Sequence, residues 1–488
     1  MRPQELFKAP NLIAGKWVDG LAKSIDVTSP YTGDVVGQAT FPDQKQIEQA
    51  LSAAHEASIS WGDKPIKERT QTMFKFREIL LRDIHKIAEV VSLENGKTLG
   101  ESKAGIMKGV EVLEYALSLQ NLDLGGKMEV SRGVQCEYRR LPLGVVASIT
   151  PFNFPAMVPM WTIPIAITLG NSYVWKPSEK TPLTATLIGN ALIEAGLPEG
   201  VLTILHGQKE TVDGVIDNKF VKAVGFVGST KIAQLVYSRA TSQGKRALCL
   251  GGAKNHIILL PDADPEIAGQ GIADSFTGCA GQRCMAASVL LAVGSVEKQI
   301  EAIKKRADET KICTGMGAII SKEQVEFLNK AIDEAVKEGA TLLRDGREDK
   351  APAEFAGGYW LGPTILDNVK AGSQAAMTEL FGPVIAIIRC SNITEALEIE
   401  NSNPYGNAAS VFTNNGAMAE LVCKKAKAGM VGINIGVPVP REPFSFGGIE
   451  DSKFGHGDIT GVHSLDFWTQ MKKVTTKWEK QKDQNWMS

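Results

Sequence analysis

Short apolar runs alternate with helix-length segments from Leu143 onward, and this alternation limits the fold more than any other feature of the 488-residue chain. The run from Leu143 to Ile149 is apolar throughout, as in a strand that is buried on both faces of a sheet. Further strands are predicted near residues 172–176, 201–205 and 223–227, with helices near 181–195 and 230–239. Strands near 247–250 and 256–260 continue the series. This order predicts an α/β fold with a mostly parallel, doubly wound sheet.

Four further regions frame the predicted sheet. Apolar residues at helical spacing predict helices ahead of it, over residues 43–58, 66–94 and 103–121. Residues 125–141 alternate like a hairpin around Gly133 and predict a protruding β-ribbon. A second α/β block follows residue 284, with helices near 296–310 and 321–338 and strands near 384–389 and 409–413. We expect the charged tail, residues 466–488, to pack against another surface.

Composition and charge exclude several classes of function. A net charge of −2 and a pI near 6.4 give no electrostatic basis for binding nucleic acid or an anionic membrane. The uncharged stretch from Leu141 to Trp175 is long enough to cross a bilayer, but prolines divide it, so we interpret it as buried structure. The N-terminus does not look like a secretory signal or transit peptide. Seven cysteines without paired or metal-site spacing predict reduced thiols, a cytoplasmic location and no bound metal.

Cys284 is the candidate nucleophile. It follows a loop of small residues, Thr277-Gly-Cys-Ala-Gly281, and has Arg283 beside it. A nearby guanidinium and backbone N–H groups stabilise a thiolate, so we expect a lowered pKa and a reactive sulfur. A buried structural cysteine is the alternative, because free cysteines are among the most buried residues. The loop residues Gly278, Gly281, Gln282 and Arg283 look too polar and flexible for core packing, which favours the nucleophile.

Two polar clusters follow predicted strands, and each also has a plain structural interpretation. Asn153, within Pro151-Phe-Asn-Phe-Pro155, can donate to a developing oxyanion, or can simply form a turn between prolines. Lys176 and Glu179 can hold the ribose hydroxyls of a nucleotide and disfavour a 2′-phosphate, or can be a solvated ion pair.

Two more segments are weak signals when taken alone. The run Gly225-Phe-Val-Gly-Ser229 leads into a helix whose N–H groups can meet a pyrophosphate, but it can equally be a tight turn with a helix cap. Glu379 stands before a turn, and a single glutamate is usually solvated. The four segments together mean more than each one separately.

Taken together and in order, these segments resemble the aldehyde dehydrogenases over essentially the whole chain. The runs PFNFPAMVPMW at 151–161, GAKNH at 252–256 and GQRCMA at 281–286 are similar to the CoA-acylating, methylmalonate-semialdehyde branch of that family. The resemblance implies a Rossmann-type NAD domain at residues 1–124 and 142–250 and an α/β catalytic domain at 251–448. It also implies an oligomerisation element, formed by the β-ribbon at 125–141 and the tail at 449–488, and hence a homodimer or homotetramer.

Site residues carry over by position. The resemblance makes Cys284 the nucleophile, with Asn153 and the Cys284 N–H as oxyanion donors. For NAD it implies that Lys176 and Glu179 bind the adenosine ribose and that Glu379 holds the nicotinamide ribose. The remaining positions of the implied cofactor site are Phe152, Gly225, Gly228, Ser229, Leu250 and Phe381.

Leu250 marks a departure from the hydrolytic members of the family, which carry a glutamate at that position. A leucine cannot accept a proton, so water should attack a Cys284 thioester slowly, whereas the thiol of CoA has a far lower pKa and needs less help. The substitution favours acyl transfer to CoA. The resemblance thus implies NAD-dependent oxidation of malonate or methylmalonate semialdehyde to acetyl-CoA or propionyl-CoA with loss of CO2.

The charged residues near the nucleophile bear on the substrate. Arg283 is expected to bind the substrate carboxylate, although it can also tune the thiol or form a structural salt bridge. The resemblance implies a second carboxylate-binding arginine, but this chain has Lys108 there, which supplies a point charge and no planar fork. Two alternatives remain open: a hydrolytic aldehyde dehydrogenase whose base comes from elsewhere, and a non-catalytic protein that retains the fold.

Overall fold

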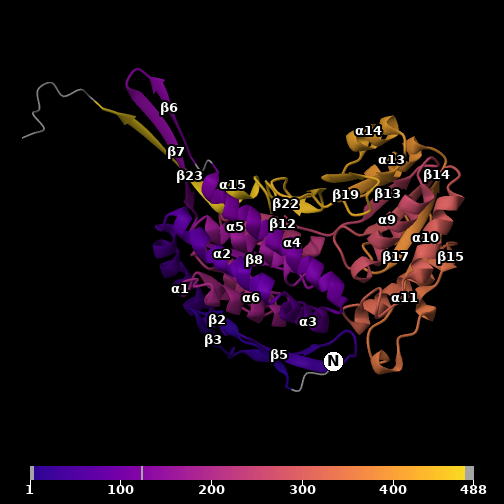
Figure 1. Cartoon of the computed structure of the whole chain (residues 1–488), viewed down its shortest axis with the longest axis horizontal. Coiled ribbons are helices and arrows are strands. Elements are labelled where there is room, and N and C mark those ends of the chain that lie inside the picture. Colours follow the sequence, from indigo (N-terminus) through magenta and orange to yellow (C-terminus); the bar gives the residue numbers. More distant parts are fainter. Residues whose placement is uncertain (1–4, 123–124, 479–488) are drawn as a thin grey trace, which may run out of the picture.

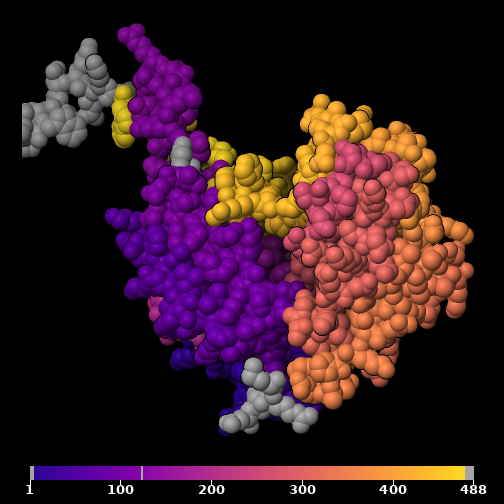
Figure 2. Space-filling view, turned by 45° about the vertical axis from the view of Figure 1, so that its right-hand side comes forward, coloured from indigo at the N-terminus to yellow at the C-terminus, as the bar shows by residue number. Residues whose placement is uncertain are grey.

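The computed structural model describes residues 5–122 and 125–478, and Figure 1 shows its arrangement. Two α/β bodies lie side by side, each around its own sheet, and a narrow ribbon projects from one of them. Figure 2 shows the yellow C-terminal segment lying between the upper parts of the two bodies. The alternation of strands and helices thus builds two sheets.

The first body contains an eight-stranded sheet in the order β22-β12-β11-β8-β9-β10-β2-β3. Its strands are β2 (Asn11–Ile13), β3 (Lys16–Val18), β8 (Val145–Ile149), β9 (Ser172–Lys176), β10 (Leu202–Ile204), β11 (Val221–Val227), β12 (Arg246–Leu250) and β22 (Lys453–Phe454). The central strands from β12 to β10 are parallel, and antiparallel strands complete both edges. The predicted parallel sheet is confirmed, whereas the edge strands β2 and β3 were not predicted.

Helices cover both faces of this sheet (Figure 1). They are α1 (Gln44–Gly62), α2 (Ile66–Arg82), α3 (Ile84–Asn95), α4 (Leu99–Ser118), α5 (Met157–Thr168), α6 (Leu183–Glu194), α7 (Lys209–Asp217) and α8 (Thr230–Thr241). Successive residues of a strand point to opposite faces, so Val146 joins a core with α2, α4, α5 and α6, while Val145 and Ala147 join a core with α1, α7 and α8. The single helix predicted over 66–94 is wrong: Asp83 leaves helical geometry (φ −98°, ψ 9°) and its carboxylate binds Arg82.

The second body contains a seven-stranded sheet in the order β15-β16-β17-β14-β13-β19-β20. Its strands are β13 (Asn255–Leu259), β14 (Ala287–Val293), β15 (Thr341–Arg344), β16 (Thr364–Asp367), β17 (Val384–Cys390), β19 (Ala408–Phe412) and β20 (Met430–Ile433). Its helices are α9 (Pro265–Thr277), α10 (Glu297–Glu309), α11 (Lys322–Lys337), α12 (Gln374–Met377), α13 (Ile393–Ser402) and α14 (Gly416–Lys425). The expectation that residues 256–260 continue the first sheet is wrong, because β13 pairs with β14 and β19. The chain changes sheets at Gly251–Lys254, between β12 and β13.

The predicted ribbon is confirmed as a hairpin of β6 (Gly125–Ser131) and β7 (Val134–Pro142), which turns at Gly133 with φ +73°. Strand β23 (Thr469–Lys477), which follows α15 (Ser464–Trp468), pairs antiparallel with the whole of β7. The tail therefore packs on the ribbon of its own chain; its last part, residues 479–488, lies outside the described residues. Smaller sheets are formed by β1 (Phe7–Ala9), β5 (Val35–Phe41) and β4 (Lys23–Thr28), and by β18 (Tyr405–Gly406) with β21 (Ile449–Glu450).

The uncharged stretch before Trp175 forms β8, α5 and β9, whose residues are almost all buried. Over residues 5–122 and 125–478, no helix has both the length and the apolar character needed to cross a membrane. All seven cysteines are described and all are free thiols. The described side chains form no cluster of His, Cys, Asp and Glu that would hold a metal ion.

Candidate active site

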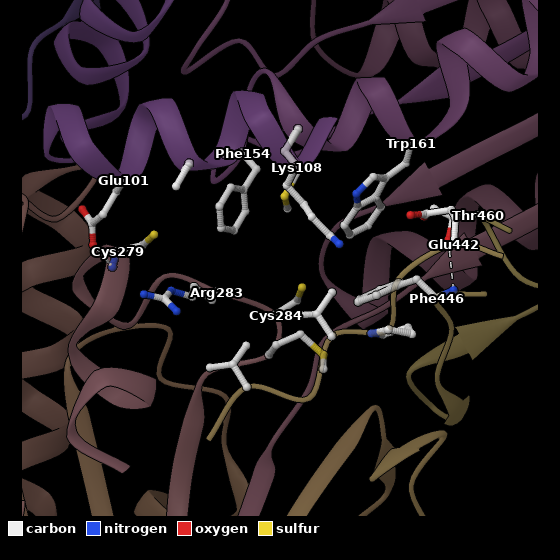
Figure 3. Close-up of a pocket in the computed structure, with 17 residues that line it drawn as sticks. Glu101, Lys108, Phe154, Trp161, Cys279, Arg283, Cys284, Glu442, Phe446 and Thr460 are labelled. Carbon is white, nitrogen blue, oxygen red and sulfur yellow. Dashed lines mark hydrogen bonds between the residues drawn. The ribbon is translucent and has the colours of Figure 1, made fainter. Parts of the chain in front are cut away.

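Cys284 lies where two cavities meet. The larger one, here called the cleft, has a volume of about 1080 Å³ and is lined by residues after β8 and β9, by the start of α8 and by Glu379. The smaller one, here called the pocket, has a volume of about 250 Å³ and is lined by α4, α5, the cysteine loop and residues 437–446 (Figure 3). Cys284 lines both, so a group attached to its sulfur can be approached from either side.

The loop before the nucleophile has an uncommon backbone. Cys279 and Ala280 both have φ +53°, and Gly281 has φ +67°, so three consecutive residues are left-handed. Such a conformation costs a non-glycine residue about 1–2 kcal/mol. A Cβ atom on Gly281 would lie 2.1 Å from the carbonyl oxygen of Gly382, so only glycine fits where these two loops touch.

Gln282 anchors this loop from inside the protein. It is buried, donates from Nε2 to the Ala318 carbonyl (3.2 Å) and accepts at Oε1 from the Ile320 N–H (3.0 Å). The interpretation that Gln282 is too polar for the core is therefore wrong, because two backbone partners satisfy its amide. The loop is fixed by burial, which favours a nucleophile held in one position.

Two asparagines hold the backbone of the nucleophile. Asn255 Nδ2 and Asn407 Nδ2 each donate to the Cys284 carbonyl oxygen at 2.8 Å, and Asn255 also donates to the Ala286 carbonyl (2.9 Å). Asn255 begins β13 and Asn407 immediately precedes β19, so the second sheet fixes the position of the cysteine. Sequence reasoning missed both roles. Asn255 does lie in the GAKNH run, whereas nothing in the sequence pointed to Asn407.

The expected lowering of the Cys284 pKa is wrong for this structure. Burial raises the pKa of the thiol to about 12, and the negative charge of Glu379 raises it further, against weaker opposition from Arg283 and from the N–H groups of Cys284 and Met285. The Arg283 guanidinium lies across Gly278 and interacts with the Cys279 thiol and with Glu101. Its charge is therefore divided among several groups, and the Cys284 sulfur is a thiol at neutral pH.

Asn153 lies against the cysteine loop. Its side chain is buried and donates from Nδ2 to the Gln282 carbonyl at 3.0 Å, which uses one of its two amide hydrogens. The backbone around it is held by Asn95, which donates to the Phe152 carbonyl (2.8 Å), and by buried Lys97, which donates to the Asn153 carbonyl. A carboxamide hydrogen thus remains available beside Cys284. Sequence reasoning did not identify Lys97.

Lys176 and Glu179 form a pair at the end of β9. Lys176 is 4% exposed, and its Nζ lies 3.5 Å from Glu179 Oε2 and 3.0 Å from the Gly207 carbonyl oxygen. Burial lowers the pKa of Lys176, and the Glu179 charge opposes that shift. The alternative of a solvated pair does not fit, because the ammonium is enclosed at the wall of the cleft.

The turn after β11 meets the cleft at Gly228 and Ser229. Ser229 is the N-cap residue of α8, but its side chain makes no capping hydrogen bond, so the first N–H groups of the helix keep no side-chain partner there. Gly225 lies deeper, within β11, where a Cβ atom would sit 3.4 Å from the Trp468 ring. Leu250 is 4% exposed and packs in the core that contains Val146. Neither Gly225 nor Leu250 lines the cleft.

Glu379 reaches the cleft from the segment after α12. Its Oε1 accepts from the Ala253 N–H at 3.0 Å, and a Cβ atom on Gly252 would lie 2.4 Å from its Oε2. Burial raises the pKa of Glu379 to about 7, although the Lys254 ammonium opposes the rise. Lys254 is itself 1% exposed, its Nζ has no hydrogen-bond partner, and burial lowers its pKa to about 7.

Two aromatic rings complete the cleft between Glu379 and Asn153. Phe152 and Phe381 meet edge to face, with ring centroids 5.8 Å apart and an interplanar angle of 80°. Of the residues implied by the resemblance, the structure brings together along this cleft Phe152, Asn153, Lys176, Glu179, Gly228, Ser229, Cys284, Glu379 and Phe381.

The pocket carries two of the predicted basic residues, and its wall also holds the carboxylates of Glu101 and Glu442 among mostly apolar side chains. Arg283 and Lys108 lie on different sides of Cys284, and Phe154, Trp161 and Phe446 line the space between the elements (Figure 3). Lys108 Nζ is 2.8 Å from Glu111 Oε2, so its ammonium already has a carboxylate partner. The Arg283 Nε is buried and has no hydrogen-bond partner. Arg283 is therefore the better placed of the two to bind an anion.

Comparisons with known proteins agree with this geometry. The model of the aldehyde dehydrogenase family matches residues 17–474. The chain is 38% identical to a malonate-semialdehyde dehydrogenase of Halalkalibacterium halodurans, over 96% of this chain and 98% of the relative. It is 39% identical to malonate-semialdehyde dehydrogenase 2 of Geobacillus thermodenitrificans, with the same coverage.

Solved structures give the same result. A methylmalonate-semialdehyde dehydrogenase from Oceanimonas doudoroffii superimposes with a TM-score of 0.95 at 36% identity, covering 98% of this chain and 99% of the other. A protein from Sinorhizobium meliloti 1021, assigned as a methylmalonate-semialdehyde dehydrogenase and solved with NAD, gives 0.96 at 34% identity and the same coverage. By sequence and by fold, this chain belongs to the aldehyde dehydrogenase family.

Proposed function

We propose that this chain is an NAD-dependent, CoA-acylating dehydrogenase that converts malonate or methylmalonate semialdehyde to acetyl-CoA or propionyl-CoA with loss of CO2. The observation that carries the proposal is a cysteine shared by two cavities, with apolar Leu250 at the position where hydrolytic relatives carry their base. The names of the relatives at 38–39% identity support the same substrate class.

The residues of the cleft fit NAD. Lys176 and Glu179 would hold the adenosine ribose, and Glu379 would hold the second ribose. The start of α8, which the Ser229 side chain leaves uncapped, would present its N–H groups to the pyrophosphate. Bound there, NAD supplies the acceptor for the hydride that leaves the substrate carbon. The Glu179 carboxylate would repel a 2′-phosphate, which favours NAD over NADP.

Oxidation begins with Cys284. As its sulfur adds to the aldehyde carbon of a substrate in the pocket, the thiol proton passes to water, because Cys284 is protonated at neutral pH. The new oxyanion receives hydrogen bonds from Asn153 Nδ2 and the Cys284 N–H. Loss of the hydride leaves a thioester on Cys284. Arg283, with its unpartnered Nε, would bind the substrate carboxylate, and Lys108 contributes less because its ammonium is already paired with Glu111.

The acyl group can be released from Cys284 by water or by the thiol of CoA. Leu250 is buried and cannot take a proton from water, so hydrolysis of the thioester is slow and a thiol acceptor is favoured. The substrate carboxylate is β to the thioester carbonyl, so CO2 can leave while the electron pair of the broken C–C bond is delocalised onto that carbonyl. The resulting enolate then takes a proton from water. The product is then a CoA ester that is one carbon shorter than the aldehyde.

The proposal is tested by following NADH formation from malonate and methylmalonate semialdehydes with and without CoA, while products are identified by mass spectrometry. We expect sustained turnover with CoA, a single burst without it, and acetyl-CoA or propionyl-CoA as products. Steady CoA-independent turnover to free acid would replace the proposal with a hydrolytic aldehyde dehydrogenase. The absence of any burst, together with no substrate protection of Cys284 against alkylation, would point to a non-catalytic protein.

We also propose that the enzyme is a cytoplasmic homodimer or homotetramer assembled through the ribbon. Met128 is 66% exposed and Val130 51% exposed on β6, the edge strand of the three-stranded sheet. Exposed apolar edges favour pairing with another chain. Light scattering after gel filtration should show a smaller particle for the double variant Met128→Asp, Val130→Asp.

A further inference from the structure

Transfer of the acyl group to CoA needs an acceptor for the thiol proton, and Leu250 cannot be that acceptor. Among the described residues that line the cleft, the acids are Glu179, Asp213 and Glu379. Glu179 is paired with Lys176, and Asp213 is paired with Lys209 and Arg239. Glu379 forms no ion pair with any side chain in the described ranges, and its one recorded hydrogen bond comes from the Ala253 N–H.

Glu379 also shares the cleft with the reacting sulfur. It lines the cleft with Cys284, and after burial its charge is the largest influence that raises the pKa of that thiol. The carboxylate is held by the turn between the two sheets, because Ala253 binds Oε1 and glycine at 252 leaves just enough room for Oε2. A preorganised carboxylate near the thioester carbon is what proton transfer during the attack requires.

We propose that Glu379 is the catalytic base of the acyl-transfer step, which rests on the proposed CoA-acylating function. As the CoA sulfur attacks the acyl carbon, its proton passes to the Glu379 carboxylate and a new C–S bond forms. The bond between the acyl carbon and Cys284 Sγ then breaks, and Glu379 returns the proton to the departing thiolate. No electrons are gained or lost. The carboxylate holds the nicotinamide ribose during oxidation and is available as a base after the cofactor leaves.

The ionisation of Glu379 suits this task. Burial raises its pKa to about 7, so near neutral pH about half of it is ionised and it is still basic enough to accept a proton. Within residues 5–122 and 125–478, the titratable groups that interact with it are Lys254 from the turn after β12, Cys284 from its loop, and Tyr405 from β18. Of these, Lys254 carries the positive charge that limits the rise, and burial keeps the Tyr405 phenol neutral by raising its pKa.

A cofactor-free assay isolates the step. The ester p-nitrophenyl propionate acylates Cys284 without NAD, and at saturating ester the steady release of p-nitrophenol reports loss of the acyl group. Two thiol acceptors are compared in assays at about pH 7.5. The thiol of CoA must lose a proton when it attacks, whereas thionitrobenzoate is an acidic thiol that is already ionised. We expect Glu379→Gln to reduce the acceleration by CoA about 100-fold and that by thionitrobenzoate less than about 2-fold.

Two further variants complete the experiment. Asp213→Asn removes another carboxylate of the same cleft and is expected to leave both accelerations unchanged. Glu379→Asp keeps a base and should recover part of the CoA acceleration. Equal losses with both thiols, no loss with either, or disappearance of the initial ester burst would each overturn the assignment of Glu379. If CoA fails to accelerate release in the unsubstituted enzyme, the proposed acylating function itself fails.

Discussion

The cleft and the pocket reach the same sulfur but are built in different ways. Residues of the cleft follow the carboxyl ends of parallel strands, with Asn153 after β8, Lys176 at the end of β9 and Gly228 after β11. The pocket combines α4, α5, the cysteine loop and residues 437–446, which lie far apart in the sequence. Binding at strand ends is a property of the architecture, whereas the pocket is where this chain sets its own substrate preference.

Replacing the Cys284 sulfur should distinguish catalysis from cofactor binding in the cleft more clearly than any other change. We expect Cys284→Ser to lower the rate of NADH formation by at least about 1,000-fold, because a serine hydroxyl without a base is a poor nucleophile. NAD binding, followed by quenching of tryptophan fluorescence, should change little because the cleft residues remain in place. Retained turnover would disprove the thioester mechanism.

Arg283 and Lys108 offer a comparison within the pocket. Arg283→Leu should raise the KM for the semialdehyde acids about 100-fold but change the KM for propanal little, because only the acids carry a carboxylate. Lys108→Leu should have a much smaller effect, since Glu111 compensates its charge. Equal effects of Arg283→Leu on acids and on propanal would remove this residue from the binding role.

Glu179 tests the cleft without altering the pocket. Glu179→Gln removes the negative charge beside the expected ribose, so the preference for NAD over NADP should fall about 10-fold. The ratio of kcat/KM values for the two cofactors measures this change. An unchanged ratio would place the selectivity elsewhere.

Substitution of Lys254 is expected to have the smallest effect on the acyl-transfer rate, and its effect on the pH profile has a defined direction. Its ammonium lowers the pKa of Glu379, so Lys254→Met should raise that pKa. A base is active above its pKa, so the acyl-transfer rate of the parent enzyme should rise through about pH 7. In the variant this rise should shift to higher pH, with a few-fold loss at neutral pH. Lys254→Arg should keep the original profile, and a profile that does not move in Lys254→Met would contradict the coupling.

Local patterns were sufficient for regular parts of the chain. The apolar run at 143–149, the helix that ends before Gly196 and the turn at Gly133 follow from spacing and from turn residues, and each is found in the structure. Patterns could not show that β13 joins another sheet or that Asp83 divides a helix, because pairing partners and a side-chain contact decide those points.

Sequence patterns were limited in the same way for the candidate active site. The order of motifs located Cys284, Asn153 and Glu379, but burial governs the thiol pKa, and burial is a property of the folded chain. Asn407 and Lys97 were missed because a single asparagine or lysine carries no pattern. Each matters only because the fold places it against a backbone carbonyl beside the nucleophile.

The close approach of Gly281 to Gly382 has a consequence for engineering. One glycine belongs to the loop of the nucleophile, and the other directly follows the segment with Glu379 and Phe381, with no room for a side chain between them. A graft that exchanged one of these loops with that of a relative would bring a mismatched surface to the contact. The two loops should therefore be transplanted as a pair, and chimeras that divide them should lose soluble expression more often than chimeras that keep them together.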